Sequence, residues 1–288
     1  MCLGDSRVLT SKNGLMRIGF QGEEYSYSDQ ASMELYPGEE REGYGTFVAA
    51  FEALRDGEVE RLVVPIENST TGSVLPVLDR LGQDHFGENQ IVAEHLVEVR
   101  HALLAHHGSS LEDLERVHSH PEALSQAEAI LTHWGWESVP THDTAGAVRL
   151  VAESGVRSDA ALGPERAAAP FGLSILLRDV VDRPHNTTRF VVLAADVTEI
   201  EPDADKTTVA FTTSHTPGAL ALALTELGLR GANLTRIESR PTEAAWRYRM
   251  FVDLTHPPGP AGVKVLFDPV PSSLADLQFL GTYRSVLR

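Results

Sequence analysis

Two hydroxyls and a guanidinium stand at the start of an apolar strand, in the stretch Asn186-Thr187-Thr188-Arg189-Phe190 that opens residues 190–195. A guanidinium can hold a carboxylate through paired hydrogen bonds, and a hydroxyl can assist a leaving oxygen by donating to it. The same residues also suit the polar lead-in of an ordinary strand. The spacing alone leaves both interpretations open, and similar strand-end groups upstream favour the functional one.

A second polar segment, residues 67–73, follows the apolar run 62–66 and precedes a helical run at 74–81. The free backbone N–H groups at a helix N-terminus, with hydroxyls beside them, form a natural site for an anion. Plain capping of this helix by Ser73 is the alternative. The sequence does not decide between the two.

Two further junctions have the same character. Ser119 closes the run 117–119 before a predicted helix over 122–134, and Gln126 falls in the first turns of that helix. At 140–144, Asp143 or Thr141 is expected to cap the next helix. The polar groups therefore recur where strands give way to helices.

Strands and helices alternate from residue 16 to about 195. Strands are predicted at 16–20, 62–66, 90–99, 101–105, 117–119, 159–163 and 190–195. Helices are predicted from Ser26 as N-cap, over 47–54, 74–81 and 122–134, after Asp143, and over 164–171. This order indicates an α/β domain with largely parallel sheets and a ligand at the carboxyl ends of the strands.

The pattern changes after a Glu-rich segment at 198–205, which reads as a linker. Beyond it we expect a strand at 206–214, a helix at 217–227, strands at 233–239 and 246–254, a short helix at 261–267 and a last strand at 277–283. The order β-α-β-β-α-β is that of the split ferredoxin-like module. The predicted domains are a flexible tail at 1–15, a domain at 16–197, a linker at 198–205 and a second domain at 206–288.

Composition excludes several classes of protein. The chain has 288 residues, 42% hydrophobic and 23% charged, which suffices for two packed domains rather than a disordered chain. With 41 acidic against 24 basic residues, nucleic acid and anionic membrane are not expected partners. No apolar run is long enough to span a bilayer, and the first residues lack a signal pattern, so a cytoplasmic location is expected. The single cysteine, Cys2, cannot form an internal disulfide.

Motifs for bound groups are missing from the sequence. Neither a phosphate-binding loop nor a strand-linked G-x-G-x-x-G is found, and no G-x-S-x-G marks a hydrolase serine. The pairs His118-x-His120 and His106-His107 lack further ligands at a familiar metal spacing. We therefore expect no metal and no cofactor.

Taken together, the chain from Met16 to Tyr283 resembles prephenate dehydratase of the two-domain bacterial type, which carries a C-terminal ACT regulatory domain. Five motifs in the expected order support the resemblance: Pro65-Ile66-Glu67-Asn68-Ser69, Ser119-His120-Pro121, Asn186-Thr187-Thr188-Arg189-Phe190, Pro217-Gly218-Ala219-Leu220 and Glu238-Ser239-Arg240-Pro241.

The resemblance implies an α/β catalytic domain of two lobes, similar to type II periplasmic binding proteins, followed by an α+β ferredoxin-like ACT domain. The family converts prephenate to phenylpyruvate, water and carbon dioxide in phenylalanine biosynthesis. Thr188 matches the residue usually assigned as proton donor, with Glu67 as the competing candidate. The expected orienting groups are Asn68, Ser119 and Gln126. The expected substrate-binding residues are Arg189, which would hold a carboxylate, with Ser69, Thr70, Thr71, Thr144 and Phe190.

The resemblance also implies feedback inhibition by L-phenylalanine, bound between ACT domains of a dimer or tetramer. The expected effector-binding residues are Pro217, Gly218, Ala219, Leu220, Asn233, Leu234, Glu238, Ser239, Arg240 and Pro241.

Two departures from the family pattern stand out. Where relatives commonly carry Gly-Pro-x-Gly, this chain has Gly22-Glu23-Glu24-Tyr25, which adds negative charge near an anionic substrate or moves the loop outward. Several prolines surround the second helix of the predicted ACT domain, which is expected to be short and irregular.

Two rival functions remain. The same dehydration of arogenate differs only by an amino group in place of the keto oxygen. A non-catalytic sensor of aromatic acids would use the two lobes as a clamp, although a clamp needs no proton donor such as Thr188.

Overall fold

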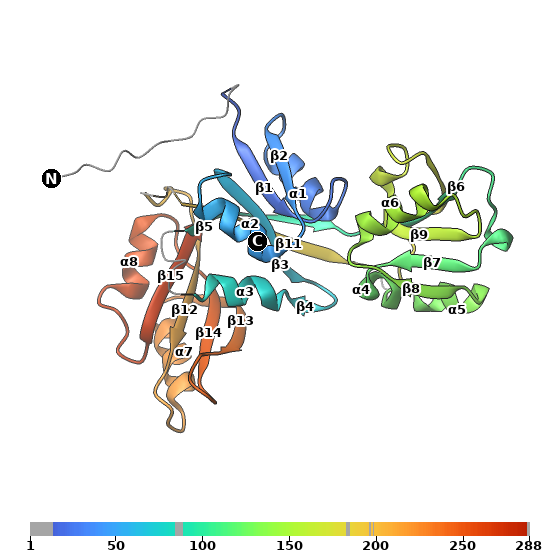
Figure 1. The fold of residues 1–288 in the computed structure, drawn as a ribbon. Coiled ribbons are helices and arrows are strands. Elements are labelled where there is room, and N and C mark those ends of the chain that lie inside the picture. The colour runs from blue at the N-terminus through green and yellow to red at the C-terminus, as the bar shows by residue number, and fades with distance from the viewer. Residues whose placement is uncertain (1–13, 84–88, 183–184, 196, 198, 287–288) are drawn as a thin grey trace.

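The computed structural model describes residues 14–83, 89–182, 185–195, 197 and 199–286. Cys2 and residues 1–13 of the predicted tail lie outside the described residues. The chain folds into two α/β lobes and a C-terminal domain, arranged so that the first lobe lies between the other two units (Figure 1). No helix in the described part of the chain is long and apolar enough to cross a membrane.

The first lobe is built on a mixed sheet with the order β2-β1-β3-β11-β5, to which the short β4 adds beside β3. The strands are β1 (Arg17–Gln21), β2 (Glu40–Tyr44), β3 (Arg61–Asn68), β4 (Gly72–Ser73), β5 (Gln90–Glu98) and β11 (Thr187–Ala194). The helices are α1 (Tyr27–Leu35), α2 (Phe47–Arg55) and α3 (Leu75–Leu81). Strands β2, β1 and β3 are parallel, whereas β11 runs antiparallel to β3 and β5.

The second lobe has the strand order β10-β6-β9-β7-β8. Its strands are β6 (His101–His106), β7 (Arg116–Ser119), β8 (Glu137–Pro140), β9 (Asp159–Pro164) and β10 (Leu173–Leu177). Its helices are α4 (Pro121–Ser125), α5 (Glu128–Trp134) and α6 (Thr144–Ser154), with 3-10 turns at η2 (Leu111–Asp113) and η3 (Glu165–Ala167). Only β7, β8 and β9 are mutually parallel, so both sheets are mixed and the expectation of largely parallel sheets is wrong.

Local sequence explains most helix starts. Ser26 and Asp143 cap α1 and α6 by accepting from the backbone N–H three residues on, as predicted. Ser73 does not cap α3, because Val74 holds that position and Ser73 belongs to β4. The predicted helix over 122–134 is broken into α4 and α5, and Gln126 is the C-cap of α4.

The C-terminal domain confirms the predicted β-α-β-β-α-β order. It contains β12 (Lys206–Thr212), α7 (Ala219–Leu229), β13 (Asn233–Pro241), β14 (Tyr248–Thr255), α8 (Pro260–Phe267) and β15 (Ala275–Tyr283). The antiparallel strand order β13-β14-β12-β15 places the first strand between the third and the last, as expected of an ACT domain. Helix α8 forms despite the surrounding prolines, because Pro260 stands in its first turn, where no N–H bond is lost.

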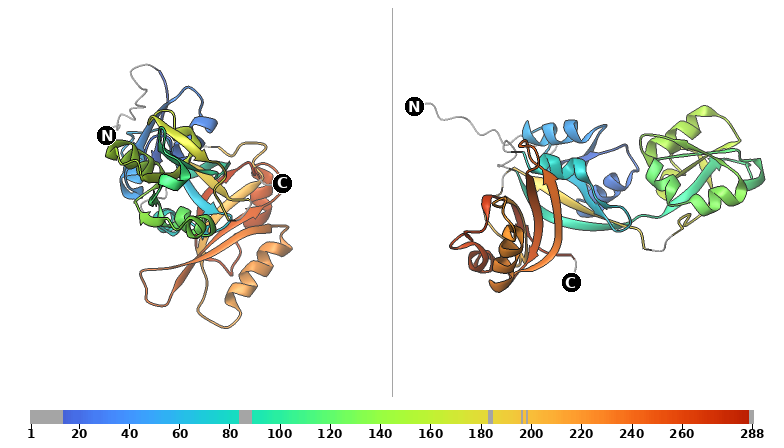
Figure 2. Two further views of the ribbon diagram at one scale, coloured as in Figure 1. Left: turned by 90° about the vertical axis from the view of Figure 1, so that its right-hand side faces the viewer. Right: turned by 90° about the horizontal axis from the view of Figure 1, so that it is seen from below.

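The C-terminal domain shares a hydrophobic core with the first lobe. Phe251 and Leu280 are buried together with Ile66, Leu78 and Ile91 of that lobe. At Gly281 of β15 the backbones approach so closely that an added Cβ would lie 2.1 Å from the Ile91 carbonyl oxygen. A side chain is therefore excluded there. The second lobe lies at the far end of the molecule from this contact (Figure 2).

Candidate active site

Five polar side chains from both lobes are joined by hydrogen bonds where the lobes meet. We call this set, Asn68, Thr70, Gln126, Asn186 and Thr188, the interlobe network. Asn68 Nδ2 donates to Asn186 Oδ1 at 2.7 Å, and Asn186 Nδ2 donates to Gln126 Oε1 at 2.6 Å. Gln126 Nε2 donates to Thr70 Oγ1 at 3.0 Å, and Thr70 Oγ1 donates back to Asn68 Oδ1 at 2.6 Å. The ring is closed, so each amide orientation is fixed by its neighbours.

Thr188 joins this ring in a way that leaves its proton available. Its Oγ1 accepts from the second hydrogen of Asn68 Nδ2 at 2.9 Å. No acceptor for the Thr188 hydroxyl hydrogen is found among the described residues. Since a hydroxyl has one donor and two acceptor positions, Thr188 remains able to donate to a ligand. The residue is buried, at 9% exposure, which limits competition from water.

The break between α4 and α5 explains the position of Gln126. Its side chain leaves the second lobe at the C-cap of α4 and contacts Thr70 and Asn186 of the first lobe. Thr70 sits in the turn between β3 and β4, where its N–H also donates to Asn68 Oδ1. These hydrogen bonds therefore form only in one relative position of the two lobes.

His101 and Tyr27 extend the site beyond Gln126, which is hydrogen-bonded to His101. The Tyr27 hydroxyl contacts His101 Nδ1 at 3.1 Å and donates to the Arg100 carbonyl at 2.7 Å. Burial lowers the pKa of His101 to about 4, although a hydrogen bond with Gln126 opposes this shift. Burial likewise raises the pKa of Tyr27 above its ordinary value. Both groups are therefore neutral near pH 7.

Glu67 and Arg189, predicted as rival donor and carboxylate holder, lie on the opposite face of the sheet. Arg189 is 4% exposed and donates to Glu94, Asp253 and Tyr283, while its Nη1 lies 3.5 Å from Glu67 Oε2. Successive side chains on a strand point to opposite faces, so neighbours of Asn68 and Thr188 must face away from the network. The structure does not bring either residue to the predicted site.

The remaining predicted residues are dispersed. Ser119 is fully buried, and its hydroxyl donates to the Leu162 carbonyl of the neighbouring strand. Phe190 is buried in the apolar core of the first lobe. Ser69 is exposed, and its hydroxyl donates to the His185 carbonyl and accepts from the Thr187 N–H.

Thr71 and Thr144 are not members of the interlobe network. Thr71 reaches Asn68 Oδ1 only through longer contacts, 3.2 Å from its N–H and 3.4 Å from its hydroxyl. Thr144 begins α6, and no hydrogen bond joins its side chain to the network within the described ranges.

In the atypical loop at 22–25, Glu23 pairs with an arginine of the second lobe. Glu23 accepts two hydrogen bonds of 2.8 Å from Arg149 of α6, and this pairing lowers the pKa of Glu23. Tyr25 has a φ of 68°, contacts Phe171 edge to face, and lies under the guanidinium of Arg166. The loop therefore links the two lobes rather than turning outward.

A cavity of about 1440 Å³ lies in the C-terminal domain, next to the end of α3. Six of the predicted effector-binding residues line it: Pro217, Gly218, Ala219, Leu220, Arg240 and Pro241. The other four, Asn233, Leu234, Glu238 and Ser239, lie on β13 outside its lining. No group of three or more His, Cys, Asp or Glu side chains that could hold a metal is found in the part of the chain that the structure describes.

Sequence reasoning did not select Asn186, although it opens the Thr-Thr-Arg-Phe stretch. It also passed over the charges of Glu94, Lys206 and Asp253, which stand inside or at the start of apolar strands and are buried. A charged residue in an otherwise apolar strand is seldom buried without a partner, and this feature could have identified the three residues.

Known proteins that are similar to this chain identify its family. Residues 18–198 match the family model described as prephenate dehydratase. The arogenate dehydratase/prephenate dehydratase 2 of Arabidopsis thaliana is 41% identical over 80% of this chain, which spans 60% of that relative's length. The bifunctional N-acyl-homoserine lactone acylase/prephenate dehydratase of Komagataeibacter europaeus is 36% identical over 96% of this chain and 95% of its own.

Among solved structures, the prephenate dehydratase of Arthrobacter aurescens in complex with L-Phe superposes with a TM-score of 0.81. It is 30% identical, over 93% of this chain and 90% of that one. The chain therefore belongs to the prephenate dehydratase family.

Proposed function

We propose that this protein converts prephenate to phenylpyruvate, carbon dioxide and water. The electrons of the breaking carbon–carboxylate bond form the new ring double bond, and the ring hydroxyl leaves. The dianion takes up one proton, so the products are the phenylpyruvate anion, carbon dioxide and water. Because the product ring is aromatic, the protein need only orient the dianion and stabilise charge on the leaving oxygen.

The available hydroxyl proton of Thr188 carries this proposal. Asn68 donates to Thr188 Oγ1 and so turns its proton outward from the network. A threonine hydroxyl is a very weak acid, so its role is a hydrogen bond that strengthens as negative charge develops on the leaving oxygen. Solvent supplies the proton that makes water.

The substrate carboxylates need a cation other than Arg189. Arg41 and Arg166 both pair with the buried Asp29, so two guanidinium groups share one carboxylate beside α1. Arg166 comes from the second lobe and also donates to the Tyr25 carbonyl, in the loop between β1 and α1. We assign Arg166 to a substrate carboxylate, with Asp29 as its partner in the free protein.

Two other reactions are suggested by the names of relatives. Arogenate differs from prephenate away from the reacting ring, so the Thr188 geometry suits it equally. Acylase action on an N-acyl-homoserine lactone requires a nucleophile activated by a base. No histidine or carboxylate is hydrogen-bonded to Thr188 among the residues described, and this favours dehydration.

Regulation by phenylalanine and self-association are part of the proposal. The cavity lined by residues 217–220 and 240–241 is far larger than one phenylalanine needs, which suits a site completed by a second copy. Large apolar side chains are exposed on this domain, including Leu229 at 85% and Trp246 at 82%. Exposed patches of this kind mark interaction surfaces. We infer at least a dimer, acting in the cytoplasm.

The test is phenylpyruvate formation by the purified protein at neutral pH, with prephenate, arogenate and an N-acyl-homoserine lactone assayed in parallel, with and without phenylalanine. Turnover of prephenate that phenylalanine reduces supports the proposal. Turnover of arogenate alone reassigns the substrate. If neither prephenate nor arogenate reacts while phenylpyruvate still binds, the protein is a sensor and the proposed function is wrong.

A further inference from the structure

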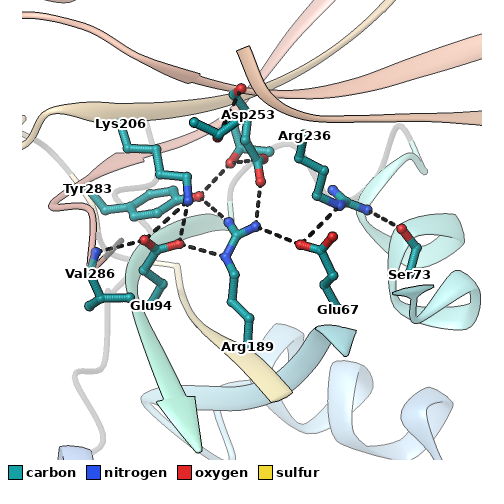
Figure 3. Close-up of polar contacts among 11 residues, drawn as sticks. Glu67, Ser73, Glu94, Arg189, Lys206, Arg236, Asp253, Tyr283 and Val286 are labelled. Atoms are coloured by element: carbon teal, nitrogen blue, oxygen red, sulfur yellow. Dashed lines mark hydrogen bonds and ion pairs between the residues drawn. The ribbon is translucent and has the colours of Figure 1, made fainter. Parts of the chain in front are cut away.

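A group of charged residues, buried except for the partly exposed Glu67, joins the first lobe to the C-terminal domain (Figure 3). We call it the interdomain cluster: Glu67, Glu94 and Arg189 from the first lobe, with Lys206, Thr208, Arg236, Asp253 and Tyr283 from the C-terminal domain. Three positive charges face three negative charges. The cluster is therefore balanced, as buried charges must be.

One half of the cluster is tightly bonded. Arg189 donates to Glu94 at 2.7 Å and to Asp253 at 2.6 Å, and Lys206 Nζ donates to Glu94 at 2.8 Å. Burial raises the pKa of Asp253, but the charges of Arg189, Arg236 and Lys206 together outweigh burial and hold that pKa below its ordinary value. Removing one charge from this half would leave the remaining buried charges unbalanced.

The other half is loosely bonded. Arg236 is 7% exposed, and its Nε lies 3.8 Å from Glu67 Oε2, too far for a hydrogen bond. Both Arg236 Nε and Nη1 are buried with no hydrogen-bond partner among the described residues. Its Nη2 donates to Ser73 Oγ at 3.0 Å. A buried guanidinium with two unsatisfied nitrogens gains hydrogen bonds if Glu67 moves toward it.

Arg236 thereby contacts the hairpin that carries two residues of the interlobe network. Glu67 and Ser73 are paired across β3 and β4, and Asn68 and Thr70 lie between them in sequence. Asn68 is in turn paired with Thr188 across β3 and β11. A movement of Glu67 toward Arg236 would shift Asn68, which orients the Thr188 hydroxyl.

The strand that carries Arg236 also reaches the cavity. Arg236 and Arg240 are four residues apart on β13, so they lie on the same face. Arg240 lines the cavity and pairs with Asp79 of α3 at 2.7 Å. A ligand that displaces Arg240 therefore acts on the same strand face that holds the hairpin.

We propose that Arg236 is a positioning residue that transmits occupancy of the C-terminal cavity to Thr188 through Glu67, Ser73 and Asn68. The proposal rests on the proposed function for its kinetic readout. The two states differ in the position of the Glu67 carboxylate. In one it interacts at long range with Arg189, and in the other it is hydrogen-bonded to Arg236. A packed element with two discrete arrangements is the physical basis of coupling between distant sites.

The test compares Arg236→Met with Arg230→Met. Arg230 pairs with Glu226 and with carbonyls inside the C-terminal domain, so its loss weakens that domain without touching the hairpin. Coupling between sites typically changes affinity by about 5- to 150-fold. We expect Arg236→Met to bind phenylalanine as wild type does, by calorimetry, while most of the effect of phenylalanine on kcat/KM is lost. Arg230→Met should keep that effect.

Rescue and hydrogen exchange separate positioning from general structure. Arg236→Lys keeps the charge that attracts Glu67 and should restore part of the coupling. In wild type, phenylalanine should change amide exchange in residues 66–73 but not in 144–154, and Arg236→Met should abolish the change. Full inhibition of Arg236→Met by phenylalanine, unchanged exchange at 66–73 in wild type, or no binding of phenylalanine would each overturn the inference. An inactive wild type would refute only the proposed function, because the exchange measurement needs no turnover.

Discussion

The side chains of Thr188 and Arg189 leave β11 on opposite faces and enter two different polar groups. Thr188 accepts from Asn68 in the interlobe network, whereas Arg189 donates to Asp253 of the C-terminal domain. Their cross-strand partners on β3 divide in the same way, Asn68 with Thr188 and Glu67 with Arg189. One peptide bond therefore separates the candidate active site from the contact with the C-terminal domain.

Asn68→Asp should remove the donor function of Thr188 with little change in shape. An aspartate side chain at 68 has no N–H, so the Thr188 hydroxyl would donate to the carboxylate instead of to the substrate. Loss of such a donor costs about a hundredfold to a thousandfold in kcat. Steady-state phenylpyruvate formation measures this, with Asn233→Asp at the start of β13 as control. A kcat within about threefold of wild type, which corresponds to less than 1 kcal/mol, would contradict the role of Asn68.

Ser119→Ala should affect stability rather than catalysis. The buried hydroxyl donates to the Leu162 carbonyl, and its loss leaves that acceptor without this partner. The expected decrease in the free energy of unfolding is about 1–3 kcal/mol, read from urea denaturation. The kcat of the folded variant should match wild type. A large loss of kcat at unchanged stability would return Ser119 to the catalytic group.

His101 should make the protein less stable in mild acid. Its folded-state pKa of about 4 lies below the unfolded value of 6.5, so only the unfolded chain takes up a proton as the pH falls below 6.5. Stability is therefore lost between pH 6.5 and 4. From pH 7.5 to 5.5 the loss attributable to His101 is about 1 kcal/mol. Urea midpoints for wild type and His101→Gln should diverge in their pH slope, and equal slopes would refute the buried neutral state.

Arg149→Met should weaken substrate binding through charge. Glu23 would lose its partner and, with Glu24, repel the substrate dianion, raising KM by about fivefold, or roughly 1 kcal/mol. The double variant Glu23→Gln/Arg149→Met should recover most of this, and added salt should shrink the effect. Glu153→Gln, which removes only the exposed second partner of Arg149, is the control. A KM unchanged in Arg149→Met would place the loop away from the substrate.

The sequence predicted the elements whose signals are local. Ser26 and Asp143 cap helices because their side-chain oxygens accept from the following backbone, a preference set within four residues. Strands β2, β8 and β10 were not predicted. The residues of β2, EREGY, are almost all polar and mostly exposed, so they lack the apolar alternation that marks a strand.

The candidate site was predicted only in part. Contacts between residues distant in sequence decide which of the predicted side chains join the interlobe network and which face the C-terminal domain. Gln126 enters the network since the helix breaks beside it, and Asn186 since β11 lies between β3 and β5. The strand period implies that Glu67 and Asn68 face opposite ways, but it does not say which faces the interlobe network. The pairing of Arg189 with Asp253, a contact between residues distant in sequence, marks the other face as the one that meets the C-terminal domain.

The kcat of Thr188→Val and Thr188→Ser tests the central claim most directly. Valine keeps the shape and loses the hydroxyl, serine keeps the hydroxyl, and Thr187→Val removes a neighbouring hydroxyl that lies outside the network. The account predicts a loss of about a hundredfold or more for Thr188→Val alone, with Thr188→Ser and Thr187→Val near wild type. Wild-type turnover by Thr188→Val would show that the leaving oxygen is stabilised by another group.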